Sequence, residues 1–340
     1  MSILFAAADP KLLSGFRAPI AGGVLALVIA WLLTPFVVKF ATKYGAVDDP
    51  TRDDRRVHTE PTPRWGGLAI YAGILIALAV ILPIAYPHES FPPYLIGLLL
   101  LGAFLTIMGA VDDKVSLSAS KQLLVLMIAG VGIQFFGQAP NRVQVGSLGI
   151  PFTHDFIRLG LWSIPLTAFY IFVVAKTTDT IDGIDGLTAG IAAISSATLT
   201  VIAVYSGQPR VAIVTGTVCG ASLGFLRHNY NPARIFMGTG GAQLLGFMLA
   251  SLSVIGAMKT AAAFAVLVPM LAFGVPIFDA AFVVIKRLRS GVPITQADKR
   301  HLHHTLLGHG LTQRQAVLVL YTLAATLCAV LLFVIVGRHG

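Results

Sequence analysis

Ten long apolar stretches dominate the sequence and fix the solvent in which this chain can fold. Each is long enough, or nearly so, for a helix to cross about 30 Å of hydrocarbon. They lie at about 18–40, 66–85, 92–111, 121–137, 158–175, 187–206, 211–226, 241–258, 260–285 and 315–337. The chain is 56% hydrophobic and only 11% charged, and its mean hydropathy is +0.82, well outside the range of soluble globular domains. We therefore predict an all-α, polytopic integral membrane protein with about ten transmembrane helices (10–11).

The rest of the chain adds little beside these helices. We find no soluble domain and expect residues 1–340 to form one membrane domain, embedded in the lipid bilayer. No basic residue precedes Lys11, so a cleaved signal peptide is not expected. Cys219 and Cys328 both fall within predicted helices, where small buried side chains are expected rather than a disulfide or a metal site. The connection APNRVQVGSLGIPF alternates in polarity and predicts a short β-hairpin.

The basic residues predict the orientation in the membrane. Of the 24 Lys and Arg residues, 17 fall in the first, third, fifth, seventh and ninth connections. Because cytoplasmic loops carry an excess of Lys and Arg, both termini are predicted outside and the odd connections in the cytoplasm. The net charge of +9 also suits a surface facing anionic lipid headgroups, and we expect no nucleic-acid partner.

The acidic residues gather on the same face. Twelve of the 15 lie on or next to the predicted cytoplasmic side: Asp48, Asp49, Asp53, Asp54, Glu60, Asp112, Asp113, Asp179, Asp182, Asp185, Asp279 and Asp298. Carboxylates do not govern topology, and a protein that needed only solubility would spread its charges over both faces. Their concentration on one face indicates a functional site.

Two acidic motifs follow apolar stretches directly. Asp112 and Asp113 are adjacent, and TTDTIDGIDG at 177–186 repeats Asp at intervals of three, which on a continuous helix would place the acids along one face. Aspartates at a membrane surface hold Mg²⁺, accept a proton or pass protons in a transporter. A capped, solvated helix end is the structural alternative for the adjacent pair.

A histidine tract, HLHH at 301–304, lies on the same predicted face. It suits a metal site, a phosphate-binding site or a solvated surface. Zinc is the weaker interpretation, because the tract has no cysteine and no nearby carboxylate other than Asp298.

Five ordered motifs give the chain a family resemblance. They are DDPTRDDRRVHTEPTPRWGG at 48–67, VDDKVSLS at 111–118, DTIDGIDGLTAG at 179–190, GFLRHNYNPARIFMG at 224–238 and PIFDAAFVVIKRLRSGVPITQADKRHLHHTLLGHG at 276–310. With them the chain resembles, over essentially its whole length, the polyprenyl-phosphate N-acetylhexosamine-1-phosphate transferases of glycosyltransferase family 4. PTPRWGG and ADKRHLHH are similar to the branch that transfers N-acetylglucosamine 1-phosphate from its UDP-sugar to undecaprenyl phosphate. The resemblance implies an enzyme of the bacterial plasma (inner) membrane that releases UMP and starts a cell-envelope polymer, with a homodimer as one option.

The resemblance also implies roles for individual residues. Asp112 is expected to deprotonate or orient the attacking lipid phosphate, and Phe236 to stack on uracil. The implied catalytic residues are Asp112, Asp113, Asp182, Asp185, His301, His303 and His304. The implied substrate-binding residues are Phe236, Gly183, Ile184, Asn229, Lys121, Arg64 and Lys176. The implied ligands of Mg²⁺, or alternatively of Mn²⁺, are Asp112 and Asp113. In this chain we expect Asp179 and Thr239, which depart from the family pattern, to complete the metal site.

The chain departs from the family pattern at the expected metal site. Thr239 stands where the family has Asp after Met-Gly, and Asp179 is an acid that the family pattern lacks. We expect Asp179 to have taken over part of the missing ligand's role, with Lys176 aimed at a substrate phosphate or paired with Asp179.

Three alternatives stay open at this point. A catalytically degenerate homologue would bind UDP-sugar or lipid phosphate without turnover. A secondary transporter would also place acids at broken helices, but it would not need HLHH in a long cytoplasmic loop. A prenyltransferase is weaker, because its paired acidic motifs should recur in a different arrangement.

Overall fold

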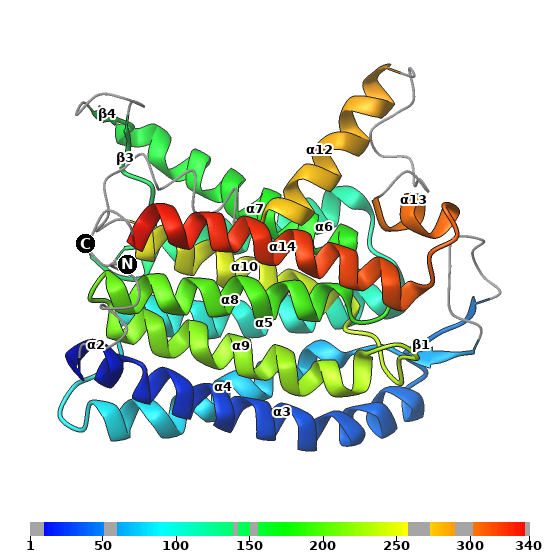
Figure 1. The fold of residues 1–340 in the computed structure, drawn as a ribbon, viewed down its shortest axis with the longest axis horizontal. Coiled ribbons are helices and arrows are strands. Elements are labelled where there is room, and N and C mark those ends of the chain that lie inside the picture. The colour runs from blue at the N-terminus through cyan, green and yellow to red at the C-terminus, as the bar shows by residue number, and fades with distance from the viewer. Residues whose placement is uncertain are drawn as a thin grey trace.

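Long helices make up most of the structure, a computed structural model that describes residues 10–50, 60–138, 142–149, 156–257, 273–289 and 302–336 (Figure 1). The helices are α2 (Pro10–Gly15), α3 (Arg17–Lys43), α4 (Gly66–Ala85), α5 (Pro93–Val115), α6 (Ala119–Gly132), α7 (Ser163–Ile181), α8 (Leu187–Tyr205), α9 (Pro209–Asn229), α10 (Gly238–Ala257), α12 (Gly274–Arg289), α13 (Leu302–Gly308) and α14 (Gln313–Val336). The 3₁₀ turns η2 (Ile133–Phe135) and η3 (Gly160–Trp162) follow α6 and precede α7. Within the described ranges, eight helical segments are long and apolar enough to span a membrane, which confirms an all-α polytopic membrane fold.

The other two predicted spans do not appear as full-length membrane helices in the described ranges. The stretch predicted at 121–137 forms a shorter apolar helix, Ala119–Phe135. The stretch predicted at 260–285 falls partly outside the described residues, and its second half forms part of α12.

Two short hairpins lie in the connections. Strands β1 (Val47–Asp48) and β2 (Thr62–Pro63) pair antiparallel, with Val47 opposite Pro63. Strands β3 (Ser147–Gly149) and β4 (Phe156–Arg158) also pair antiparallel. The predicted hairpin therefore forms, although its second strand lies beyond APNRVQVGSLGIPF. The two cysteines are free and lie within α9 and α14; Cys328 is buried, as expected, whereas Cys219 is only half-buried.

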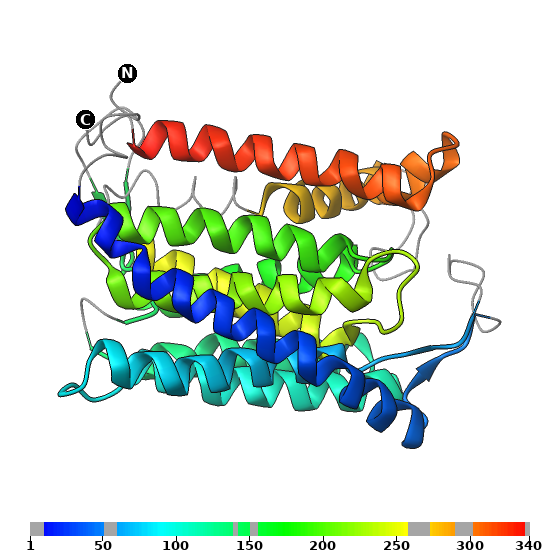
Figure 2. The same ribbon diagram turned by 60° about the horizontal axis from the view of Figure 1, so that its bottom comes forward.

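The chain runs back and forth, so its connections gather at two ends. The start of α2, the end of α14 and the β3–β4 hairpin lie at one end, and the β1–β2 hairpin and α13 lie at the other (Figures 1 and 2). The connections after α3, α5, α7 and α9 share the end with β1 and α13. The motifs that carry the acidic residues therefore meet at one end of the bundle, as the alternation of basic connections predicts.

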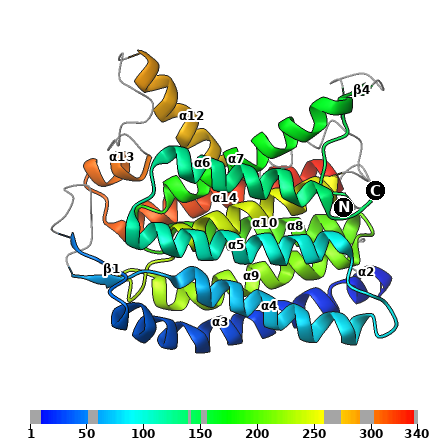
Figure 3. The same cartoon turned by 180° about the vertical axis from the view of Figure 1, so that it is seen from behind.

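Helix α10 is the centre of the bundle. In its apolar stretch Gly238–Ile255, 94% of the residues are buried. It packs against α4, α5, α7, α8 and α9, and Figure 3 shows α4, α5 and α6 side by side on one face of the molecule. The outer helices expose large apolar side chains such as Phe36, Ile84 and Phe333, because lipid tails are as apolar as these side chains.

Glycines let the central helices approach backbone to backbone. A Cβ atom added at Gly109 of α5 would lie 2.1 Å from the Cα atom of Gly240, and one added at Gly67 of α4 would lie 2.4 Å from the backbone nitrogen of Gly241. Small residues permit such close packing of membrane helices. The glycines of MGTGGAQ and RWGG therefore let α10 pack closely against α4 and α5, at the end of the bundle where the acidic motifs lie.

Candidate active site

Asp113 joins the last turn of α5 to the first turn of α10. Its Oδ1 atom accepts a hydrogen bond of 3.1 Å from the backbone N–H of Thr239. That N–H belongs to the free amino end of a helix, where the helix dipole favours a negative charge. The Asp113 side chain is only 1% exposed, and its Oδ2 atom is buried without a hydrogen-bond partner. Asp113 is thus a buried carboxylate with one oxygen still unsatisfied.

Arg64 pairs with two carboxylates. Its guanidinium lies 3.4 Å from Asp113 and 3.1 Å from Asp48, and its backbone N–H donates to Ala46 O. The next residue, Trp65, has a left-handed backbone (φ 77°) and donates its indole N–H to Ala110 O. The β1–β2 hairpin and the start of α4 therefore hold Arg64 against Asp113. The predicted substrate-binding arginine is engaged by protein carboxylates.

Asp112 faces a different set of donors. Its Oδ1 atom accepts the backbone N–H of Leu117 at 2.6 Å, and the side-chain amide of Gln122 lies 3.2 and 3.1 Å from Oδ1 and Oδ2. The residue is buried in the last turns of α5, just before the short connection to α6. These three hydrogen bonds fix the orientation of the carboxylate.

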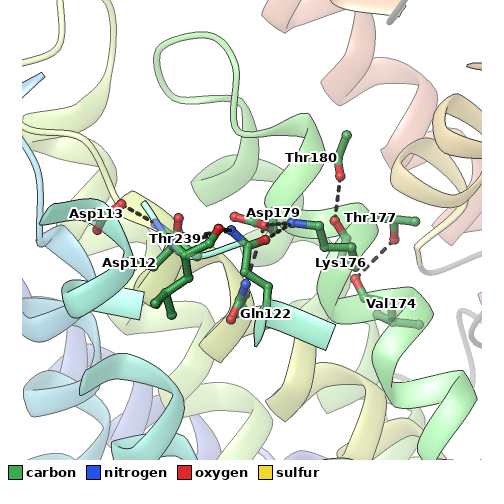
Figure 4. Close-up of polar contacts among 11 residues, drawn as sticks. Asp112, Asp113, Gln122, Val174, Lys176, Thr177, Asp179, Thr180 and Thr239 are labelled. Carbon is green, nitrogen blue, oxygen red and sulfur yellow. Dashed lines mark hydrogen bonds and ion pairs between the residues drawn. The ribbon is translucent and has the colours of Figure 1, made fainter. Parts of the chain in front are cut away.

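Lys176 and Asp179 lie one turn apart on α7 and form an ion pair of 2.7 Å. The same ammonium donates to the Oε1 atom of Gln122 at 2.7 Å. A longer contact of 3.5 Å joins Gln243 to Asp179. Figure 4 shows Gln122 between the Asp112 side and the Lys176–Asp179 side of the site. Of the two roles expected for Lys176, the structure contains the pairing with Asp179.

Asp182 follows the last residue of α7 and is half-buried. Its pKa is raised from 3.8 to about 7, mainly by burial, and the negative charges of Asp179 and Asp113 contribute to this rise. These three carboxylates are therefore close enough to repel one another. Of the neighbouring residues in the predicted pocket segment, Gly183 is exposed and Ile184 is buried.

The acidic trio does not lie along one helical face, which corrects the expectation from its spacing. Helix α7 ends at Ile181, and the next turn reaches a left-handed residue at Gly186 (φ 81°), where α8 begins. Only Asp179 is therefore helical. The glycines of IDGIDG end the helix and redirect the chain, which sends Asp182 and Asp185 to different surroundings.

Asp185 and Asn229 tie two connections together. The Oδ2 atom of Asp185 accepts hydrogen bonds from the Asn231 amide (2.9 Å) and the backbone N–H of Ala233 (3.0 Å). Asn229 accepts the backbone N–H of Gly186 and donates to the carbonyl oxygen of residue 235. The α7–α8 and α9–α10 connections are thereby fixed to each other. In the described part of the chain, the hydrogen bonds of Asp185 and Asn229 therefore hold these two connections in shape.

Phe236 and Lys121 are the two remaining substrate-binding candidates. Phe236 is half-buried in the α9–α10 connection, where its backbone N–H donates to Pro63 O and its carbonyl accepts from Gly66. Lys121 is exposed in the first turn of α6. The structure brings Phe236 to the start of α10 and leaves Lys121 on the surface.

The histidine loop is described only in part. His301 and the side chain of His303 lie outside the described residues, whereas His304 is half-buried in α13. The first residue of α13, Leu302, donates its backbone N–H to the buried Asp279 of α12 at 2.6 Å. Asp279 therefore positions the helix that carries the histidines.

The carboxylates suit a hard divalent cation in their chemistry. Mg²⁺ prefers oxygen ligands, and the buried, unsatisfied Oδ2 atom of Asp113 is such a donor. No three His, Cys, Asp or Glu side chains in the described ranges already have the geometry of a metal site. Asp112 and Asp179 are instead turned toward Gln122 and Lys176. Binding a cation therefore requires some of these side chains to rotate.

Two amides in the site were not predicted from the sequence. Gln122 contacts both Asp112 and Lys176, and Gln243 of α10 approaches Asp179. Each lies in an apolar segment within a few residues of a family motif, and that position is the only signal the sequence offers. The residue expected from the sequence was the neighbouring Lys121, which carries a charge.

Comparison with known proteins covers most of the chain. Residues 95–257, from α5 to α10, match glycosyl transferase family 4. A probable undecaprenyl-phosphate N-acetylglucosaminyl 1-phosphate transferase of Bacillus subtilis (strain 168) is 34% identical over 88% of this chain and 80% of its own length. A decaprenyl-phosphate N-acetylglucosaminephosphotransferase of Mycobacterium leprae is 32% identical over 88% and 79%. An undecaprenyl-phosphate alpha-N-acetylglucosaminyl 1-phosphate transferase of Escherichia coli (strain K12) is 29% identical over 86% and 77%.

Proposed function

Because this chain belongs to glycosyl transferase family 4, we propose that it transfers N-acetylglucosamine 1-phosphate from UDP-N-acetylglucosamine to undecaprenyl phosphate and releases UMP. The observation that carries this proposal is the carboxylate cluster at one end of a bundle of membrane helices. A lipid phosphate in the headgroup layer and a nucleotide sugar from the water can both approach such a position. The names of the three relatives support N-acetylglucosamine phosphate as the transferred group and a polyprenyl phosphate as the acceptor.

The proposed reaction forms one P–O bond and breaks another. An oxygen of the lipid phosphate attacks the phosphorus that carries the sugar. The bond from that phosphorus to the oxygen bridging the two phosphates breaks, and UMP leaves with that oxygen. Negative charge is spread over the phosphoryl oxygens in the transition state, so positioning and electrostatic stabilisation supply most of the catalysis.

Asp112 is suited to receive the lipid phosphate. Its orientation is fixed by Leu117 and Gln122, and of the described contacts only the one from Gln122 reaches Oδ2. A carboxylate oxygen has two acceptor positions, so Oδ2 can still accept a proton from the phosphate or orient it. This agrees with the role that the family resemblance implies.

Asp113, Asp179 and Asp182 would hold Mg²⁺, or Mn²⁺ in its place. In the described part of the chain these acids and Asp112 interact with only two cations, Arg64 and Lys176, and Arg64 is shared with Asp48. The carboxylates therefore outnumber the cations. When bound, the metal ion would neutralise charge on the phosphate oxygens. Thr239 would contribute through its backbone N–H, which holds Asp113 in place.

The sugar nucleotide would lie beside the α9–α10 connection. Phe236 is half-buried there, and the contacts of Asp185 and Asn229 give this connection a fixed shape. A half-buried aromatic ring beside ordered backbone is suited to stacking on a base. The three relatives are bacterial, and we propose the plasma membrane as the location of this protein.

The test uses purified protein with radiolabelled UDP-N-acetylglucosamine, undecaprenyl phosphate and Mg²⁺. UMP and lipid-linked sugar should appear together in equal amounts, and chelation of the metal should stop both. Binding of UDP-sugar without turnover would instead identify a degenerate homologue. Uptake into proteoliposomes without UMP formation would identify a transporter.

A further inference from the structure

Gln122 occupies the space between the two carboxylate-bearing helices of the site. It lies in the first turn of α6 and is half-buried. Helix α6 packs against both α5 and α7. The Gln122 amide donates toward both oxygens of Asp112 on α5 and accepts the ammonium of Lys176 on α7. One neutral side chain thereby links a carboxylate to an ion pair on a different helix (Figure 4).

The chemistry of the partners allows only one orientation of this amide. Lys176 has donors only, so it must meet the carbonyl oxygen of Gln122. The Asp112 carboxylate accepts through both oxygens, so it meets the NH₂ group. Reversing the amide would place donor against donor and acceptor against acceptor. The side chain is therefore locked by its two partners, and it locks them in return.

From this geometry we propose that Gln122 is a positioning residue. It holds the Asp112 carboxylate at a fixed position relative to Lys176 and Asp179. The inference deepens the proposed transferase function and rests on it. Gln122 touches no reacting atom, and it acts by fixing where the Asp112 carboxylate points. Its neutrality is part of the role, because a carboxylate at this position would repel Asp112 and leave Lys176 shared among three acids.

A matched pair of variants separates positioning from packing. Gln134, in η2 at the opposite end of the same helical segment, donates to Gly130 O and to Ile164 O of α7. It is therefore an amide of the same type that ties α6 to α7 away from the carboxylates. Gln122→Met and Gln134→Met each remove these hydrogen bonds and keep a side chain of similar length.

The two variants should differ in kinetics. Gln122→Met should lower kcat by roughly 10- to 100-fold, the expected effect of losing hydrogen bonds to charged groups. Its KM for UDP-N-acetylglucosamine should change by less than about threefold, because the nucleotide pocket is not contacted. Gln134→Met should lower Tm and leave kcat within about twofold of the wild type. Equal kcat values for two folded variants would overturn the proposal.

Exchanging the two side chains gives a second test. Lys176→Gln alone leaves Asp179 without its cation and should lower kcat. Adding Gln122→Lys restores the number of charges and lets Lys pair with Asp112 while Gln meets Asp179. Turnover of the double variant should exceed that of Lys176→Gln at least about fivefold. A double variant no better than Lys176→Gln would contradict a direct link between the positions.

The link can also be measured without turnover. In the metal-free protein, Gln122→Met and Lys176→Met should lower Tm by less in combination than the sum of the two single effects, because they share one hydrogen bond. Additive effects on Tm would overturn the inference. If the wild type is inactive but the Tm effects are non-additive, the proposed function is contradicted. The contact between Gln122 and Lys176 is then still supported.

Discussion

The ammonium of Lys176 lies 2.7 Å from the carboxylate of Asp179, one turn later on α7. The lysine side chain remains 37% exposed, so it can move away without leaving a buried charge behind. Asp179 is thus a carboxylate whose charge is balanced by a cation that a metal ion or a substrate phosphate could displace. This relationship bears directly on how the chain compensates for Thr239.

The first prediction concerns Asp179 and Thr239 together. Asp179→Asn should raise the Mg²⁺ concentration for half-maximal turnover by roughly tenfold or more, as expected when a group at a metal site is lost. In the Thr239→Asp background the same change should have only a mild effect, because residue 239 lies beside Asp113 and would supply the missing carboxylate. Mg²⁺ titrations of the wild type, both single variants and the double variant measure this coupling.

Additive effects in that cycle would deny any exchange of roles between the two positions. A wild type that is inactive and gains turnover from Thr239→Asp alone would show that the native chain is a degenerate transferase.

The second prediction concerns the adjacent pair. Asp112→Asn and Asp113→Asn should each lower turnover by at least about 100-fold, since general-base and metal contributions are typically this large. Single-turnover rates with saturating UDP-sugar measure the effect. A wild-type rate in either folded variant would remove that residue from the mechanism.

The third prediction concerns the nucleotide. Phe236→Ala should weaken UDP-sugar binding by about 1–3 kcal/mol if the ring stacks on uracil. Phe333→Ala, an exposed position on α14, serves as the control and should leave affinity unchanged. Calorimetric titration with UDP-N-acetylglucosamine measures both. Unchanged affinity together with a lower Tm for Phe236→Ala would assign the ring to packing.

The fourth prediction concerns pH. The pKa of Asp182 is raised from 3.8 to about 7 in the folded protein, mainly by burial. The folded state therefore binds more protons than the unfolded state between these values, and this residue lowers stability as pH rises through that window. Asp182→Asn should raise Tm at pH 8 in metal-free protein, and the gain should shrink toward pH 4. Even about 1 kcal/mol would move Tm by roughly 2–4 °C.

The same variant should lose turnover at pH 8, because the carboxylate is one of the proposed Mg²⁺ ligands. A Tm gain that does not depend on pH would show that the charge of Asp182 is not its cause.

The fifth prediction concerns the close approach of α5 and α10. Gly109→Ala would place a Cβ atom 2.1 Å from Gly240 Cα, which is backbone and cannot rotate away. Overpacking of this kind costs about 1–3 kcal/mol. It should lower Tm and also slow turnover, because Asp113 would move from the Thr239 N–H. Gly132→Ala meets only the Leu101 side chain at 3.4 Å and should change neither quantity.

The sequence alone determined the membrane fold and the end of the bundle that carries the site. Hydrophobic length and the placement of Lys and Arg are local properties, which can be summed along the chain without knowing which helices touch. The predicted span at 66–85 and the helix α4 coincide for this reason. The gathering of Asp112, Asp113 and Asp179 at one end follows from the alternation of direction between successive helices.

Only the tertiary structure decided which partner each carboxylate meets. Asp113 meets Thr239 because glycines bring α5 against α10, and Asp112 meets Gln122 because α6 turns back beside α5. The spacing of the acidic trio suggested one helical face, but the turn after Ile181 separated Asp185 from Asp179. Such contacts join residues far apart in the chain, and their geometry depends on helix packing distances of a few ångströms. A pattern of residue types along one segment does not contain that information.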